Sequence, residues 1–155
     1  MGMSTDDGLL EWGIWRDFIR YIDGISDSSI DVADGASRDD LGRFRFPAVS
    51  GVGDDRIMRF RGKVTITAYA QVLQIMLRNP VLQMSPEGPG YLLAENPYRR
   101  GHRVPIAQLQ APVDSGGRKV AVATLTVDGA ALLSEGRFKA GVEVDPVSWS
   151  PGADR

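Results

Sequence analysis

The chain contains no cysteine and a single histidine, His102, among its 155 residues. The absence of cysteine excludes disulfides, iron–sulfur clusters, zinc–thiolate sites and thiol nucleophiles. A single imidazole also excludes any site that needs two of them, which removes most zinc centres built from protein side chains. Much enzyme chemistry is therefore closed to this chain.

Long apolar runs and an excess of positive charge are also missing. The chain has 18 basic and 20 acidic side chains, a formal net charge of -2, so we expect no nucleic-acid partner. No run approaches the length of a transmembrane helix, so we expect no membrane span. The acidic start, MGMSTDDGLLEWG, has no basic region followed by an apolar one, as a signal peptide would. We therefore expect a cytoplasmic location.

The charged clusters of the sequence have ordinary explanations. Three acidic pairs (6–7, 39–40 and 54–55) lie in polar, glycine-containing segments, so we interpret them as solvated loops, not as acid–base dyads. The basic segment 98–103 around His102 is either a clamp for carboxylate or phosphate groups or a solvated loop, and solvated loops are commoner. The sequence contains neither a G-x-S-x-G nucleophile elbow nor a G-x-x-x-x-G-K-[ST] phosphate loop.

The composition, 43% hydrophobic and 25% charged, is that of an ordinary globular protein, and the length fits one domain over residues 1–155. We expect its ends, 1–8 and 149–155, to be flexible. An amphipathic helix is predicted at about 11–22, because Trp15, Phe18, Ile19 and Ile22 follow helical spacing. Asp23-Gly24 provides its stop. Residues 26–40 are polar and predict a loop or a weak strand.

From Gly42 onward the pattern is that of β-strands. Strict alternation in 43–46, closed by Pro47, is typical of a half-buried strand. Further strands are predicted at 57–60, 64–70, 72–77, 81–84, 91–94, 104–110 and 119–127. A helical turn is expected at 129–136, and Asp145-Pro146 is expected to begin an irregular tail. The predicted fold is mainly β: an antiparallel sandwich or open barrel of at least eight strands, with one N-terminal helix and a short C-terminal helical turn.

Aromatic residues are the most informative side chains. Tyr21 lies beside the apolar stripe of the predicted helix, and Tyr69 lies on the semi-polar face of the predicted strand 64–70. Each hydroxyl needs a partner if it is buried. A cleft walled by aromatic rings and containing two phenols suits a flat hydrophobic ligand with one polar anchor. The residues alone leave two alternatives open, a plain core and a ligand pocket.

A series of short motifs follows in order along residues 9–148. They are Leu10–Ile22 with its Trp12-Gly13 pair, Gly35-Ala36, Phe44-Arg45-Phe46-Pro47, Phe60-Arg61-Gly62-Lys63-Val64, Asn79-Pro80-Val81, Gly136-Arg137-Phe138 and Asp145-Pro146. As a set, they resemble the HtaA domain of actinobacterial haem-uptake proteins. The resemblance implies a mostly antiparallel β fold with a short helix, holding haem in a surface cleft.

The resemblance also implies roles for individual residues. Tyr21 matches the tyrosine that binds the haem iron, and Phe138 matches a phenylalanine that stacks on the porphyrin. A histidine that hydrogen-bonds the tyrosine is replaced here, because the matching dipeptide is Ala68-Tyr69. A phenol in that place preserves a hydrogen bond to Tyr21 with a different geometry and proton affinity.

Three hypotheses follow for the function. The first is a domain that binds a small hydrophobic molecule, with haem as the cofactor implied by the resemblance, through Tyr21, Tyr69 and Phe138 together with Trp15, Phe46 and Phe60. The second is a cofactor-free enzyme of the cyclase or isomerase type in natural-product biosynthesis, with Tyr21 and Tyr69 as catalytic residues. The third is a structural module, either a monomer or a homodimer, in which the side chains of Trp15, Phe46 and Met58 fill the cleft.

Overall fold

The computed structural model describes residues 8–49, 56–85, 89–99, 101–134 and 139–150. Within them the chain forms two helices, α1 (Arg16–Asp23) and α2 (Val127–Ser134), and thirteen strands, all paired antiparallel. The strands are β1 (Leu9–Trp12), β2 (Ser29–Ala33), β3 (Ser37–Arg38), β4 (Phe44–Pro47), β5 (Ile57–Arg59), β6 (Lys63–Ala68), β7 (Leu73–Arg78), β8 (Val81–Gln83), β9 (Gly90–Glu95), β10 (Arg103–Leu109), β11 (Val113–Ser115), β12 (Arg118–Leu125) and β13 (Glu143–Ser150). The predicted mainly β class is confirmed.

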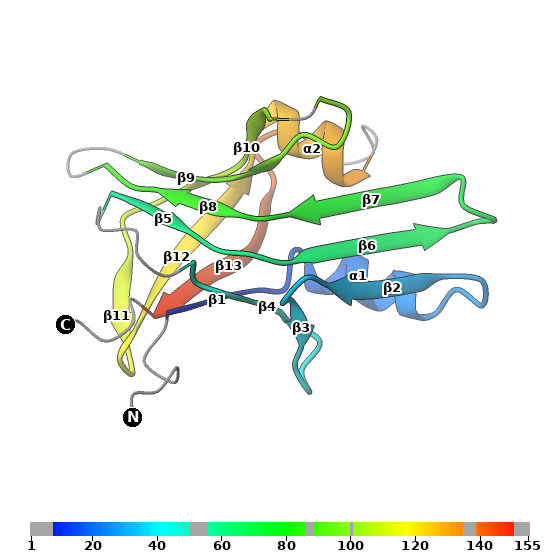
Figure 1. Ribbon diagram of the computed structural model, residues 1–155, viewed down its shortest axis with the longest axis horizontal. Helices are drawn as coiled ribbons and strands as arrows, with labels where there is room; N and C mark the ends of the chain where they lie inside the picture. The colour runs from blue at the N-terminus through cyan, green and yellow to red at the C-terminus, as the bar shows by residue number, and fades with distance from the viewer. Residues whose placement is uncertain (1–7, 50–55, 86–88, 100, 135–138, 151–155) are drawn as a thin grey trace.

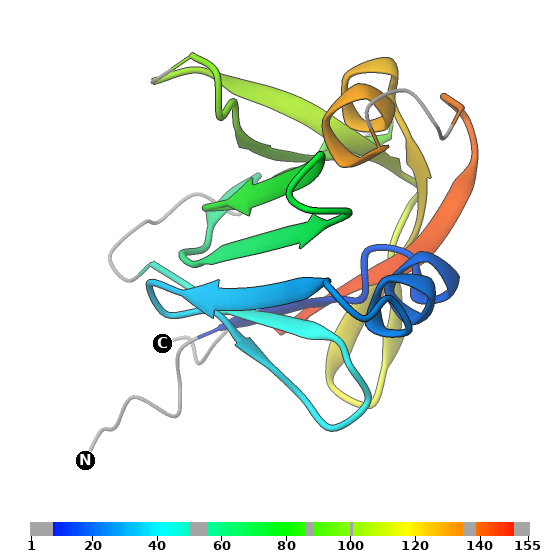
Figure 2. The same cartoon turned by 90° about the vertical axis from the view of Figure 1, so that its right-hand side faces the viewer.

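Ten of these strands form one curved sheet that closes on itself. Its order is β3-β4-β1-β13-β12-β10-β9-β8-β5, with β11 paired to β12 (Figure 1). Just beyond β4 and β5, Ala48 and Phe60 form an antiparallel bridge, and the Val49 N–H donates to the Arg59 carbonyl at 2.9 Å. Because the two ends of the sheet meet, the architecture is a barrel, whose curvature Figure 2 shows.

A second sheet of three strands, β2-β6-β7, extends from the barrel. β6 and β7 continue β5 and β8 as one long hairpin, which passes from one sheet to the other at Gly62 and Asn79 (Figure 1). There the Gly62 N–H donates to Asn79 Oδ1 at 3.0 Å, and the Asn79 N–H donates to the Gly62 carbonyl at 2.8 Å. Gly62 has φ 138°, and a Cβ at this position would lie 2.7 Å from the Cβ of Ala36, so the crossing requires glycine.

The core follows from the alternation of apolar residues along the strands. In β6 the buried residues are Val64, Ile66 and Ala68, and the intervening side chains are partly exposed. α1 adds Phe18, Ile19 and Ile22 to the same core. The helix lies beside β2, whereas α2 lies next to β7 and β10 (Figure 2).

The start of the predicted N-terminal helix differs from the structure, whereas its end agrees. The predicted helix 11–22 begins at Arg16, because Leu9–Trp12 forms strand β1 between β4 and β13. The chain turns from strand to helix through Ile14, which has φ 65°. The helix ends at Asp23, and the N–H of Gly24 donates to the Arg20 carbonyl at 3.2 Å, so the predicted stop is in place.

The predicted irregular tail is wrong, because residues 143–150 form strand β13. Asp145 and Pro146 lie where the register of β13 against β12 shifts, so the missing N–H of proline costs no ladder hydrogen bond. Trp149 and Ser150, which we expected in a flexible end, pair with Leu10 and Leu9. The segment predicted as a loop or weak strand, 26–40, contains β2 and β3.

Candidate functional site

Tyr21 of α1 and Tyr69 of the β6–β7 turn meet although 48 positions separate them in sequence. Their hydroxyls hydrogen-bond to each other. Both side chains are accessible, with exposed fractions of 52% for Tyr21 and 36% for Tyr69. The structure therefore brings the two phenols together, and it does so at the surface of the protein.

An unusual backbone turn presents Tyr69. Tyr69, Ala70 and Gln71 have φ of 55°, 54° and 71°, three successive left-handed residues that are not glycine. Such conformations cost about 1–3 kcal/mol each and persist where their surroundings hold them. The Val72 N–H donates to the Tyr69 carbonyl at 3.0 Å and closes the turn.

Asp27 is the residue that ties this turn to α1. Its carboxylate accepts hydrogen bonds from the N–H of Tyr69 at 3.3 Å and from the N–H of Ala70 at 2.8 Å. Asp27 lies in the short connection between α1 and β2. The carboxylate therefore links the segment that follows Tyr21 to the segment that carries Tyr69, which keeps the two hydroxyls in register.

The other aromatic residues predicted for the site lie elsewhere. Phe46 and Phe60 are 0% and 3% exposed and belong to the hydrophobic core, whereas the two tyrosines are accessible, so the expected contact of these rings with a ligand stays a prediction. Their positions on β4 and next to β5 point them into the barrel, where burial stabilises the closure. Trp15 is partly buried against the core. Phe138 lies outside the described residues.

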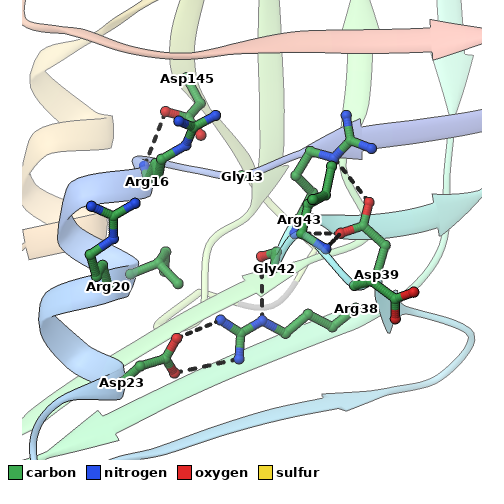
Figure 3. Close-up of a pocket in the computed structure, with 12 residues that line it drawn as sticks. Gly13, Arg16, Arg20, Asp23, Arg38, Asp39, Gly42, Arg43 and Asp145 are labelled. Atoms are coloured by element: carbon green, nitrogen blue, oxygen red, sulfur yellow. Dashed lines mark hydrogen bonds and ion pairs between the residues drawn. The ribbon is translucent and has the colours of Figure 1, made fainter.

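The opposite side of α1 borders a charged cavity of about 740 Å³. At about 100° per helical residue, Tyr21 lies on one side of the buried Phe18–Ile19–Ile22 stripe, and Arg16 and Arg20 lie on the other. We call these the phenol flank (Tyr21) and the guanidinium flank (Arg16 and Arg20). The cavity is lined by Gly13, Arg16, Ile19, Arg20, Asp23, Arg38, Asp39, Asp40, Leu41, Gly42, Arg43 and Asp145 (Figure 3).

Internal pairs hold the walls of this cavity in place. Arg38 Nη2 lies 2.8 Å from Asp23 Oδ2, and Arg43 Nε lies 2.9 Å from Asp39 Oδ2 (Figure 3). Partial burial acts to raise the pKa of Asp39. The backbone N–H groups of Arg43 and Leu41, the guanidinium hydrogen bond and the charge of Arg43 outweigh burial, so the pKa lies below its usual value. Asp39 is therefore a structural anion and not a general acid.

Sequence reasoning missed both Asp27 and the guanidinium flank. The spacing of Arg16 and Arg20, four residues apart on a predicted helix, was the one available indication of a shared face. The role of Asp27 could not be found, since it depends on a turn 42 residues away. His102 is exposed, and the described residues contain no cluster of three or more His, Asp or Glu side chains suited to a metal.

In a comparison with models of protein families, the HtaA model matches residues 7–150, almost the full chain. This chain belongs to the HtaA family. A comparison with curated protein sequences gives no significant match. Among the residues described, neither α1 nor α2 has the length and apolar character needed to cross a membrane.

Solved structures of HtaA-family proteins share the fold. The N-terminal domain of HtaA from Corynebacterium glutamicum matches with a TM-score of 0.73 and 21% identity, over 96% of this chain and 98% of that one. The C-terminal domain of the same HtaA protein matches with a TM-score of 0.71 and 20% identity, over 92% of this chain and 94% of that one. The haem-binding protein HtaB from Corynebacterium glutamicum matches with a TM-score of 0.70 and 16% identity, over 93% of this chain and 92% of that one.

Proposed function

We propose that this chain binds haem at the Tyr21–Tyr69 pair, with the Tyr21 oxygen as the iron ligand. The observation that carries the proposal is the hydrogen bond between two accessible phenols on elements far apart in sequence. Membership of the HtaA family and the similarity to the haem-binding protein HtaB support it.

The donor set at the pair fits ferric haem. Tyrosine oxygen is a known axial ligand of haem iron. When bound, haem supplies a Lewis-acidic iron that favours the deprotonated form of a coordinating phenol. A hydrogen bond donated to the phenolate oxygen would further stabilise such a ligand. With Tyr21 deprotonated on the iron, the Tyr69 O–H is the donor left in their shared hydrogen bond, in the place where the family resemblance implies a histidine.

Accessibility of the pair is consistent with a ligand that enters from solvent. Tyr21, Tyr69 and Val72 leave apolar surface exposed on α1 and on the β6–β7 turn. An apolar porphyrin face gains free energy by covering such surface. The same exposure argues against the cofactor-free enzyme, because water reaches both hydroxyls, and no observation on the described residues favours cyclisation or isomerisation there.

Titration with haemin, followed by absorption spectroscopy, tests the proposal. The wild-type chain is expected to give a shifted Soret band and the charge-transfer band of a phenolate–iron complex. Tyr21→Phe should remove the charge-transfer band. Tyr69→Phe should keep it but weaken haem affinity about 10–100-fold, as the loss of a residue that orients a metal ligand does.

Tyr98→Phe is the matched control, because Tyr98 is an exposed tyrosine in the β9–β10 connection and should leave the spectrum unchanged. Retention of the charge-transfer band by Tyr21→Phe would exclude Tyr21 as the iron ligand. Absence of any spectral change with the wild-type chain would remove haem altogether.

A further inference from the structure

The guanidinium flank of α1 carries positive charge that none of the described side chains neutralises in an ion pair. Neither the Arg16 nor the Arg20 guanidinium has an ion-pair or hydrogen-bond partner among the described residues, and both side chains are exposed. They lie four residues apart on the same side of the helix, and both line the cavity (Figure 3). Two adjacent like charges repel each other, which an anion between them would relieve.

Most of the acidic side chains around the cavity are already engaged. Asp23 pairs with Arg38, and Asp39 pairs with Arg43. Asp145 Oδ1 accepts a hydrogen bond from the N–H of Arg16 at 3.0 Å, so its charge is offset by the positive end of the helix dipole. Asp40 is the lining carboxylate for which the described residues show no such engagement. The paired groups therefore form rigid walls, and the free charge of the cavity lies chiefly on α1.

We propose that this cavity binds the carboxylate or phosphate group of a small anionic ligand between Arg16 and Arg20. A guanidinium presents a planar fork of donors that matches both kinds of group and can bind them through two parallel hydrogen bonds. A volume of about 740 Å³ holds a metabolite-sized molecule. The buried stripe of α1 separates this site from Tyr21, so the proposal is independent of haem binding.

Nuclear magnetic resonance of the arginine Nε–Hε groups in the full chain tests the site directly. Sodium phosphate, sodium pyrophosphate and sodium citrate are titrated separately, with sodium chloride at matched ionic strength as the reference. Saturable shifts are expected at Arg16 and Arg20. Phosphate and pyrophosphate acting without citrate would identify a phosphate site, and citrate acting alone would identify a carboxylate site.

Variants distinguish the contribution of the planar guanidinium donors from that of positive charge alone. Arg16→Gln/Arg20→Gln should weaken binding about tenfold or more, in the range of charge-assisted hydrogen bonds. Arg16→Lys/Arg20→Lys keeps the charge, loses the fork and should give intermediate affinity. Asp40→Asn removes the repelling carboxylate and should strengthen binding about twofold, a small effect because the group is exposed. Circular dichroism checks that each variant folds.

Arg99→Gln/Arg103→Gln is the matched control, because it removes two positive charges from the segment around His102. Loss of binding in this control but not in Arg16→Gln/Arg20→Gln would place the anion site in that segment and overturn the proposal. Equal binding by the wild type and both double variants, or shifts no larger than those in sodium chloride, would also overturn it. The haemin spectrum of Arg16→Gln/Arg20→Gln should equal that of the wild type.

Discussion

The two flanks of α1 carry opposite kinds of surface, although they belong to one helix of eight residues. The phenol flank presents an uncharged hydroxyl that reaches another element, the β6–β7 turn. The guanidinium flank presents two cations to a cavity whose other charges are largely paired. One buried stripe can therefore hold two chemically independent surfaces, because each surface takes its partners from a different part of the chain.

The largest expected effect comes from truncating a side chain in the buried stripe of α1 that both flanks share. Ile22 is fully buried in the middle of the stripe, so Ile22→Ala is expected to lower the free energy of unfolding by about 2–5 kcal/mol through lost burial and a residual cavity. Urea denaturation measures the change. Val113→Ala, at an exposed position, should change it by less than about 0.5 kcal/mol.

If Ile22→Ala lowers the free energy of unfolding no more than the Val113→Ala control does, α1 is not held by this stripe. If the helix shifts but the protein stays folded, both the haemin spectrum and the Arg16 and Arg20 resonances should change together. A change on one flank alone would show that the flanks are anchored separately.

Loss of the N-terminal cap of α1 should come next. The side chain of the N-cap residue Trp15 makes no capping hydrogen bond to the helix, and Asp145 of β13 accepts from the Arg16 N–H instead. Asp145→Ala is therefore expected to destabilise the protein by about 1 kcal/mol, as the loss of a capping carboxylate does. Thermal denaturation measures it against Asp114→Ala, which breaks only an exposed ion pair with Lys119. Equal melting temperatures for the two variants would refute the capping role.

Asp27→Ala should disturb the phenol flank alone. The carboxylate of Asp27 holds the N–H groups of Tyr69 and Ala70, so its loss should release the left-handed turn and destabilise it by about 0.5–1.5 kcal/mol. Carbon-13 labelling of the tyrosine rings should show shifted Tyr21 and Tyr69 signals, with Arg16 and Arg20 unchanged. Asp31→Ala, a nearby exposed acid, is the control. Unshifted tyrosine signals in Asp27→Ala would mean that the turn holds itself.

The smallest expected effect is a pH dependence of stability from Asp39, in the wall of the cavity that the guanidinium flank borders. The pKa of Asp39 is lower in the folded chain than its unfolded value near 3.9, so its anion stabilises the fold above about pH 4. This contribution is lost as the pH falls through the folded pKa. The difference in unfolding free energy between wild type and Asp39→Asn should therefore be constant from about pH 5 to 7 and shrink below about pH 4. A difference that stays constant to pH 2.5 would exclude the shift.

Local patterns predicted the elements whose partners lie nearby or whose burial alternates strictly. The alternation of apolar residues predicted strands at 43–46 and 64–70, and the structure has β4 (Phe44–Pro47) and β6 (Lys63–Ala68) there, with residues 69–70 in the β6–β7 turn instead of the strand. β1 and β13 escaped prediction, since Leu9-Leu10-Glu11-Trp12 does not alternate and Asp145-Pro146 is typical of a loop. Their pairing joins residues 141 positions apart, such as Leu9 and Ser150. Only the barrel makes these segments strands.

The motifs that carry the family resemblance serve the fold more than the site. Gly35, Ala36, Phe46 and Gly62 converge where the long hairpin leaves the barrel, and a side chain at Gly62 would collide with both Ala36 and Phe46. Tyr21 is the member of the set that remains accessible at the candidate site. The resemblance therefore predicted the architecture well, whereas Phe46 and Phe60, predicted to line a ligand surface, lie in the hydrophobic core.

The amino-acid sequence by itself determined the mainly β class, the stripe of α1, the absence of thiol and multi-histidine sites, and the family. These properties depend on composition and on spacings of two to four residues, which any short stretch of chain carries with it. Tertiary structure decided that Tyr21 meets Tyr69, that Asp27 holds the turn between them, and that four arginines surround one cavity. Such contacts join segments far apart along the chain, so they exist only once the barrel has closed and brought the backbone segments together.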